Sequence, residues 1–374
     1  MGGQFIRRLG TRLFNLTESV KSVDRRCPIH PRNPWIRESF RWRVVFRLFG
    51  GCQVRYPVVM LNRWMVLLWL PWALALGAEP TLVERLGYPA GSRLLIINGD
   101  DAGMCHTANV ATIESMEKGL MTSATIMVPC PWFGEMVRYA KAHPEKDFGL
   151  HLCQTSEWQV YRWGPVAPKA EVPGLIDPDG YFWHEVPQVY ASAKPEEAYI
   201  ESRAQVKKAL AAGIDVTHLD SHMGTLQLHP AYVEQYLKLA VEFDLPVRMA
   251  SQATLEKNNG GAIRAAFAAQ GIVFPDDFIY EDLKDEPKDV KGYWMRKLSA
   301  LKPGVTELFI HAGQPTEELK AVTGSWRTRS EEFEVFTKDS EMRALLEREK
   351  VVRIGWRPLR ELQRRDRAAK QTGK

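Results

Sequence analysis

The sequence predicts an α/β fold, an irregular seven-stranded (β/α) barrel that is TIM-barrel-like. From Gly91 onward, short apolar runs alternate with longer segments of helical period. Such alternation requires parallel strands joined by right-handed crossovers. An open, doubly wound sheet meets the same requirement and stays as the alternative. The barrel is favoured because polar residues follow strands one, three, four and six, whereas an open sheet collects them at one switch point.

The expected strands are short apolar runs, at 94–98, 123–128, 148–153, 216–219, 245–249, 307–311 and 351–354. The expected helices span 106–118, 195–212, 230–243 and 331–347. Gly119 and Gly213 come directly after two of these helices, and Pro195 and Pro230 begin two of them. Glycine favours helix ends and proline favours first turns, so these residues support the predicted bounds.

Charge is distributed unevenly along the 374 residues. Residues 1–59 carry a net +9 and Arg63 adds one, so the total of +5 leaves −5 for residues 79–374. The Arg-rich leader 1–59 has no regular period and is expected to be disordered, or not translated if synthesis starts at Met60. Residues 79–374 are expected to form the single barrel domain, and their acidic balance argues against a nucleic-acid partner.

Residues 60–78 have the pattern of a secretory signal peptide. One positive charge precedes fifteen uncharged, mostly apolar residues, and small residues precede Glu79. The run is shorter than the roughly 20 residues of a membrane span, and it contains Pro71. We therefore expect cleavage near Ala75 or Ala78, export to the periplasm or the extracellular space, and no stable membrane insertion afterwards. An uncleaved anchor is the alternative.

Three cysteines lie in the expected domain, namely Cys105, Cys130 and Cys153. Their number and spacing fit neither a disulfide scaffold nor a zinc ribbon. One bridge is conceivable in an exported protein, and three buried small hydrophobic side chains are equally compatible with the pattern.

Carboxylate and imidazole side chains stand at four of the predicted strand ends. Asp100 and Asp101 follow the first strand, and His151, His222 and His311 stand at or just past the ends of later ones. Parallel strands bring these ends to one rim, where one Asp and two His can hold a divalent metal with positions left for water and substrate. The other Asp and His can then transfer protons. Taken singly, Asp101 could instead cap a helix, and His151 could be a packed core residue.

Neighbouring residues add to this pattern. Asp220 and Ser221 are available to hydrogen-bond the ring of His222. His218 is expected to pack within its strand, and His229 to begin a helix. The triad also suits non-haem Fe(II) oxygenases, but the extra Asp and His favour hydrolysis.

Two further clusters have a functional and a structural interpretation. Aromatic side chains in or beside segment 161–183 either stack on sugar rings or pack on one another. Arg329 and Glu331 either belong to a site or form a solvated, ion-paired helix start.

Five segments in order resemble the motifs of the YdjC-like (ChbG-type) carbohydrate deacetylases, over about residues 91 to 356. They are Asn98-Gly-Asp-Asp-Ala-Gly103, Gly149-Leu-His-Leu152, His218-Leu-Asp-Ser-His222, Glu307-Leu-Phe-Ile-His-Ala-Gly313 and Arg329-Ser-Glu-Glu-Phe333. The resemblance implies an irregular (β/α) barrel, a divalent metal such as Mg²⁺ or Zn²⁺, and removal of acetyl groups from N-acetylated sugars such as chitooligosaccharides.

By the same resemblance, Asp101, His151 and His222 are the metal ligands. Asp100 resembles the base that activates water, and His311 resembles the acid that protonates the leaving amine. The chain departs from the motifs in three places, with Gly99 for Ala, Met223-Gly224 where more His is common, and Ala312 for Pro.

Two other functions remain open at this stage. A glycosidase on a similar barrel needs two carboxylates across the scissile bond, and no acid pair besides Asp100 and Asp101 is as well placed. A catalytically silent member would bind sugar and metal without releasing acetate. The sugar, its chain length, the acyl group, the metal and the oligomeric state are not fixed by the sequence, and a homodimer is one option.

Overall fold

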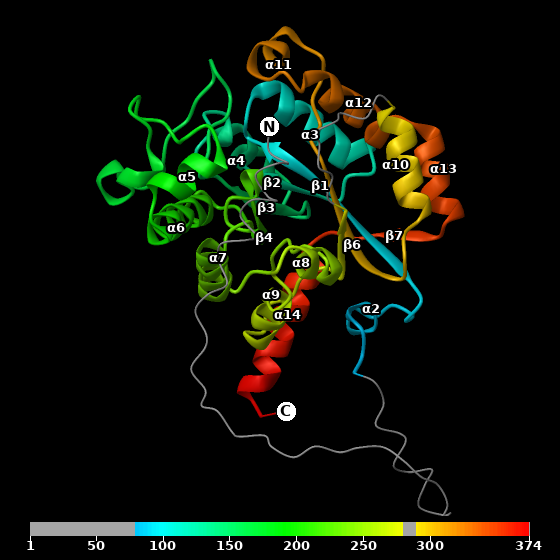
Figure 1. Ribbon diagram of the computed structural model, residues 1–374. Coiled ribbons are helices and arrows are strands. Elements are labelled where there is room, and N and C mark those ends of the chain that lie inside the picture. Colours follow the sequence, from blue (N-terminus) through cyan, green and yellow to red (C-terminus); the bar gives the residue numbers. More distant parts are fainter. Residues whose placement is uncertain (1–78, 280–288, 374) are drawn as a thin grey trace, which may run out of the picture. The chain divides into compact units, whose positions relative to one another are not determined.

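Seven parallel strands form one sheet in the computed structural model, which describes residues 79–279 and 289–373 (Figure 1). The strands are β1 (Arg93–Ala102), β2 (Ser123–Ile126), β3 (Phe148–Leu152), β4 (Val216–Ser221), β5 (Asp277–Ile279), β6 (Gly304–Ile310) and β7 (Val351–Arg353). Their order is β4-β3-β2-β1-β6-β5, and β7 pairs with the first residues of β1. The predicted α/β class with parallel strands is confirmed.

The sheet is a half-barrel that does not close completely, which corrects the predicted closed barrel. Segment 245–249 was predicted as a strand, but it forms only an isolated bridge between Leu219 and Val247. On its other side, this segment is joined to the segment around Val273 by one backbone hydrogen bond, from Val247 N to Val273 O at 3.2 Å. Pro246 has no N–H to contribute to a ladder, which explains why pairing stops here. The seventh strand is instead β5, which the apolar pattern did not predict.

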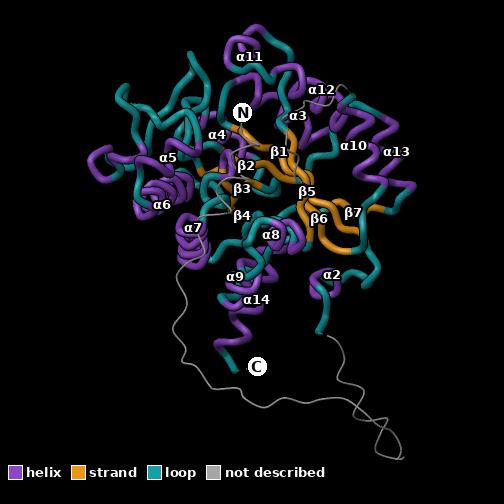
Figure 2. The backbone as a smooth tube through the Cα atoms, viewed as in Figure 1, coloured by secondary structure: helices purple, strands orange, loops and turns teal. Residues whose placement is uncertain are grey.

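Helices lie around the sheet (Figure 2). They are α2 (Leu82–Arg85), α3 (His106–Lys118), α4 (Phe133–Ala142), α5 (Val186–Ser192), α6 (Pro195–Ala211), α7 (Pro230–Phe243), α8 (Gln252–Lys257), α9 (Ile263–Ala269), α10 (Val290–Ser299), α11 (Glu317–Val322), α12 (Trp326–Thr337), α13 (Ser340–Arg348) and α14 (Arg357–Gln371). The predictions for α3, α6 and α7 are confirmed within one residue. The predicted helix 331–347 is two helices, because the Asp339 side chain accepts a hydrogen bond from Met342 N and starts α13.

β1 is buried on both faces, as expected for a central parallel strand. Leu94 and Ile96 pack into one apolar cluster, and Leu95 and Ile97 pack into another. Strand residues alternate between the two faces, so Asn98 and Asp100 continue the face of Leu94 and Ile96. The polar residues at the end of β1 therefore begin on the face that Leu94 and Ile96 occupy.

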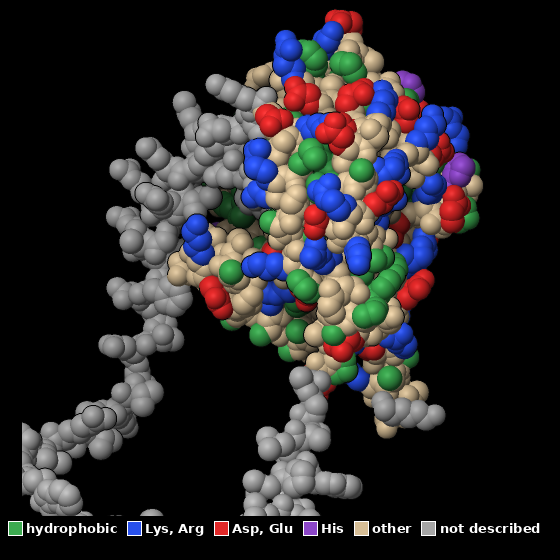
Figure 3. Space-filling model, turned by 90° about the vertical axis from the view of Figure 1, so that its right-hand side faces the viewer, with side chains coloured by type: hydrophobic (Ala, Val, Ile, Leu, Met, Phe, Trp, Pro, Cys, Tyr) green, Lys and Arg blue, Asp and Glu red, His purple; other side chains and the backbone are tan. Residues whose placement is uncertain are grey.

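The structure bears on the cysteines, but the leader and the signal peptide cannot be compared with it. Cys105, Cys130 and Cys153 are buried and free, as small hydrophobic side chains would be. The predicted leader 1–59 and signal peptide 60–78 lie outside the described residues. Among the helices that the structure describes, none is long and apolar enough to cross a membrane. On the face seen in Figure 3, basic and acidic side chains are interspersed.

Candidate metal centre

Asp100 and Asp101 both point toward the buried group of polar side chains at the strand ends, which is called the centre below. Neighbouring residues in a strand normally point to opposite sides. Asp101 has a left-handed backbone with φ of 65°, and the pairing of β1 with β2 shifts register between Gly99 and Ala102. Aspartate tolerates this conformation better than most residues do. The break in alternation therefore lets two adjacent carboxylates contribute to one buried polar cluster, and such local strain is typical of functional sites.

The three predicted metal ligands converge. Asp101 Oδ1 lies 3.3 Å from His151 Nε2 and 3.5 Å from His222 Nδ1, and all three side chains are buried. These atoms form a group that could hold a metal ion, with every ligand atom within 4.8 Å of the others. Asp101 Oδ1 has no hydrogen-bond partner in the described part of the chain. A buried carboxylate oxygen without a partner, facing two imidazoles, fits a divalent cation.

The carboxylates around the two rings favour positive charge between them. Burial favours the neutral ring, but Glu157 and Asp101 raise the pKa of His222 to about 9. Burial acts in the same way on His151, yet Asp220 and Asp100 hold its pKa well above the usual range. In the metal-free chain, protons thus supply the positive charge that a metal ion would supply.

Each ring has a carboxylate on its far side. His151 Nδ1 lies 2.6 Å from Asp220 Oδ1, and His222 Nε2 lies 2.8 Å from Glu157 Oε2. The sequence predicted Asp220 and Ser221 as partners of His222. That pairing is wrong: Asp220 holds His151, and Ser221 Oγ accepts from Leu226 N. Asp220 is the register partner of His151 in the β3–β4 pair, so its side chain lies beside His151 on the same face of the sheet.

Arg329 and His311 approach Asp101 from its other oxygen. Arg329 Nη2 lies 2.7 Å from Asp101 Oδ2, and His311 Nε2 lies 3.9 Å from the same atom. Burial raises the pKa of Asp101, but the Arg329 cation together with the His151 and His222 rings outweighs burial and holds that pKa well below the usual range. Arg329 is buried, so the interpretation of a solvated helix start is wrong for this residue. Burial, followed by Arg329, lowers the pKa of His311 to about 4, so this ring is neutral at pH 7 without metal.

Arg248 holds Asp100 with two hydrogen bonds, and sequence reasoning missed it. Its Nη1 and Nη2 lie 2.7 and 2.8 Å from the Asp100 oxygens. The same guanidinium contacts Asp220 at 2.9 Å and Glu307 at 3.0 Å. Burial raises the pKa of Asp100, but Arg248 and His151 lower it far below the usual range. The sequence did contain a signal for Arg248, because it is a charged residue within the apolar run 245–249. A charge next to an apolar run was also what indicated the pair Asp100 and Asp101.

Glu332 was also missed, although it lies in a quoted motif. Its Oε2 accepts a hydrogen bond from His311 N at 2.7 Å, whereas the neighbouring Glu331 lines a surface cavity. Successive residues on a helix point about 100° apart, so only one of this pair can face the centre. Burial raises the pKa of Glu332 from 4.5 to about 7.

Glu332→Gln should flatten the pH dependence of stability. A folded-state pKa above the unfolded value means that folding favours the protonated acid, so stability falls as pH rises from 4.5 through about 7. Glutamine does not titrate and can still accept from His311 N. We expect the free energy of unfolding of the variant, relative to the parent, to improve by up to about 3 kcal/mol between pH 4.5 and pH 8. Urea unfolding at the two pH values measures this, and equal differences at both would contradict it.

The aromatic cluster near the centre packs mainly on itself. Trp158 and Trp163 are buried, with ring centroids 5.2 Å apart, and Trp163 lies 6.0 Å from the His222 ring. Tyr181 is 40% exposed, and the Arg162 guanidinium lies over its ring at 5.2 Å from the centroid. The structural interpretation therefore holds for the two buried tryptophans.

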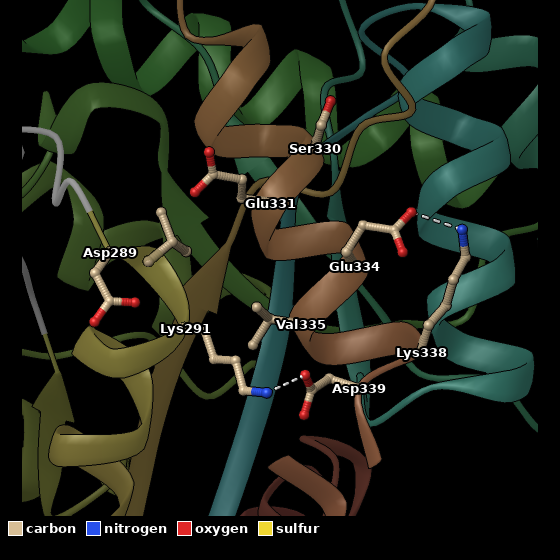
Figure 4. Close-up of a pocket in the computed structure, with 9 residues that line it drawn as sticks. Asp289, Lys291, Ser330, Glu331, Glu334, Val335, Lys338 and Asp339 are labelled. Atoms are coloured by element: carbon tan, nitrogen blue, oxygen red, sulfur yellow. Dashed lines mark hydrogen bonds and ion pairs between the residues drawn. The ribbon is translucent and has the colours of Figure 1, made fainter. Parts of the chain in front are cut away.

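A surface cavity of about 600 Å³ lies between α10 and α12 and contains none of the predicted site residues (Figure 4). Its charged side chains pair with one another, Lys291 with Asp339 at 2.6 Å and Lys338 with Glu334 at 2.7 Å. Such solvated pairs contribute little energy and need no ligand. The chemistry therefore lies at the strand ends and not in this cavity.

Comparison with known proteins agrees with this geometry. A family model described as YdjC-like protein matches residues 94–348, which is more than half of the chain. The chain belongs to the YdjC-like protein family. The match contains all five predicted site residues, and it confirms the resemblance stated from the motifs.

Two relatives with similar sequences carry an enzyme name. A protein from Thermus thermophilus is 31% identical over 286 residues, which are 75% of this chain and 98% of that protein. One from Brevibacillus brevis is 33% identical, over 62% of this chain and 91% of its own length. Both are named carbohydrate deacetylase, which is a hydrolase, so the predicted enzyme class is confirmed.

One solved structure resembles the fold. It is a crystal structure from Enterococcus faecalis, of a protein provisionally named a cellobiose-phosphate cleavage protein. The TM-score is 0.62 at 25% identity, and the match covers 72% of this chain and 99% of the other. The likeness supports the half-barrel architecture of this YdjC-like chain.

Proposed function

We propose that this YdjC-like chain is a metal-dependent hydrolase that removes acetyl groups from N-acetylated sugars or oligosaccharides. The observation that carries the proposal is the convergence of Asp101 Oδ1, His151 Nε2 and His222 Nδ1, with Asp100 and His311 beside them. The relatives named carbohydrate deacetylase support the reaction class. The orphaned Asp101 oxygen supports the metal.

In this proposal Asp101, His151 and His222 hold a Zn²⁺ or Mg²⁺ ion. Such an ion, when bound, polarises an acetyl carbonyl and makes water a better nucleophile at neutral pH. Asp220 and Glu157 accept from the outer nitrogens of the two rings, which leaves Nε2 of His151 and Nδ1 of His222 free as ligands.

The proton transfers fall to Asp100 and His311. Arg248 keeps Asp100 ionised, as a base for the attacking water must be, although the same contact lowers the basicity of the carboxylate. His311 is neutral at pH 7 before the reaction because its pKa is lowered, so the proton that Asp100 takes from water must pass to His311 during turnover. It can then protonate the departing amine as acetate leaves. Its side chain is 21% exposed and so can reach a substrate.

Asp100→Asn should separate proton transfer from metal binding. The amide keeps the shape of the side chain but is not a base, so we expect kcat to fall by about 100-fold to 10,000-fold while Zn²⁺ affinity stays within a few-fold. Acetate release and calorimetric metal titration measure the two quantities. Unchanged acetate release in the variant would remove Asp100 from the base role.

Acetate release from N-acetylglucosamine oligomers tests the function as a whole. The purified protein is assayed with Zn²⁺, with Mg²⁺ and with EDTA, and acetate is expected only when metal is present. Cleavage to shorter oligomers without acetate would favour a glycosidase. Sugar and metal binding without any product would favour a silent member.

We also propose that the protein is exported, on the pattern of residues 60–78. N-terminal sequencing of the secreted or periplasmic product should give a start near residue 76 or 79. A product that begins at Met1 or Met60 would contradict cleavage.

A further inference from the structure

We propose that Glu157 is a positioning residue that fixes the orientation and tautomer of His222, and that metal affinity depends on it. The inference rests on the proposed metal-dependent function. No motif quoted above contains Glu157, and its role follows only from where the folded chain places it.

The contact between the two side chains is direct. Glu157 Oε2 lies 2.8 Å from His222 Nε2, and on the opposite side of the ring His222 Nδ1 lies 3.5 Å from Asp101 Oδ1. A carboxylate can only accept here, so Nε2 must carry the hydrogen in this contact. When a metal ion displaces the second proton, Nδ1 of the neutral ring offers its lone pair to the ion, which is the arrangement that a histidine ligand requires.

The backbone around Glu157 is held by a second segment of the loop region. Ser156 N donates to Trp183 O at 2.8 Å, and Trp163 N donates to Ser156 Oγ at 3.0 Å. The His184 ring lies 3.4 Å from the carbonyl oxygen of Glu157. A carboxylate on such a fixed backbone can orient a ring, whereas one on a free loop end would not.

The other side of His222 is packed, so its ring has little freedom once Glu157 is in place. The Trp163 ring lies 6.0 Å from it and the His151 ring lies 5.1 Å from it at 71°. These contacts limit where the ring sits, but in the described part of the chain neither ring hydrogen-bonds a nitrogen of His222. Among the described residues, Glu157 makes that selection through Nε2.

The chain offers a matched control two residues away. Glu157 and Gln159 line the same cavity of about 300 Å³, together with segment 320–324 that ends α11 and follows it. Gln159 is exposed and is not among the described residues that hydrogen-bond His222. Replacing Gln159 therefore alters the cavity wall without altering the support of the imidazole.

Zn²⁺ titration by calorimetry tests the inference on the full chain and on Glu157→Ala, Glu157→Gln and Gln159→Ala. We expect Glu157→Ala to weaken Zn²⁺ binding by about 10-fold to 100-fold. Glu157→Gln keeps an acceptor and should recover at least half of that loss on a logarithmic scale. Gln159→Ala should bind like the parent, and the thermal midpoint of metal-free Glu157→Ala should stay close to that of Gln159→Ala.

Three results would overturn the inference, and they are distinguishable. If the parent binds Zn²⁺ and Glu157→Ala binds it equally well, Glu157 does not position His222, while the proposed function stands. If the parent binds no divalent metal, the proposed function fails and the inference fails with it. A loss of affinity in Glu157→Ala that only follows a lower thermal midpoint, without recovery in Glu157→Gln, would make the residue structural and would also overturn the inference.

Discussion

We expect Asp101→Ala to abolish metal binding and to lower kcat at least about 1,000-fold, because it removes the one carboxylate among the described residues that faces both imidazoles. His222→Ala should have the same effect. Asp101→Ala also leaves the buried Arg329 without its 2.7 Å partner, so Asp101→Asn serves as the version with less disturbance of shape. Metal content after dialysis and acetate release are the measurements, with circular dichroism to confirm folding.

His229→Ala is the matched histidine control, since His229 caps α7 away from the centre. It should keep metal and activity. An Asp101→Ala protein that still binds one equivalent of metal and releases acetate would contradict the ligand assignment.

Arg248→Met should destabilise the fold by about 3–5 kcal/mol. Arg248 is buried and contacts the carboxylates of Asp100, Asp220 and Glu307, so its removal leaves buried acids without their counter-charge. Burial raises the pKa of Glu307 to about 8 even with Arg248 present, so this acid can respond by taking up a proton. Urea unfolding of the metal-free protein at pH 7 measures the loss.

Two comparisons sharpen the Arg248 result. Arg203→Met removes an exposed pairing with Glu242 and should change stability little. Adding Glu307→Gln to Arg248→Met removes one of the unpaired acids and should recover part of the lost stability. A loss below about 1 kcal/mol in Arg248→Met would show that the guanidinium is not the counter-charge of this cluster.

Sequence patterns predicted the elements whose signal is local. The strands that became β1, β3, β4 and β6 are short runs rich in apolar and β-branched residues, and each ends at or next to a polar residue of the centre. The rule that parallel strands end on one rim was then enough to expect that Asp101, His151 and His222 meet. The structure does bring these three together.

Features that depend on contacts between distant segments could not be predicted. β5 has only three residues, and it is a strand because it pairs with β6. Pro246 ends the pairing beyond β4, although its surroundings are apolar enough for a strand. Likewise, Asp220 was assigned to His222, two residues further along the chain, whereas the register of β3 and β4 places it beside His151.

Glu157 and Arg248 show the same limit for the site. Each is an isolated charged residue outside a histidine-containing motif, and each acquires its role through a partner 65 to 148 residues away. Only the signal at Arg248, a charge within an apolar run, was present in the sequence. The left-handed backbone of Asp101 had no sequence signal beyond the ability of Asp to adopt it.

Anomalous diffraction from crystals of the full chain grown with Zn²⁺ tests the metal centre most directly. We expect one strong peak in the anomalous map whose nearest protein atoms are Asp101 Oδ1, His151 Nε2 and His222 Nδ1. A map with no peak there, while Zn²⁺ is bound at another place or not at all, would contradict the centre and the hydrolytic mechanism that depends on it.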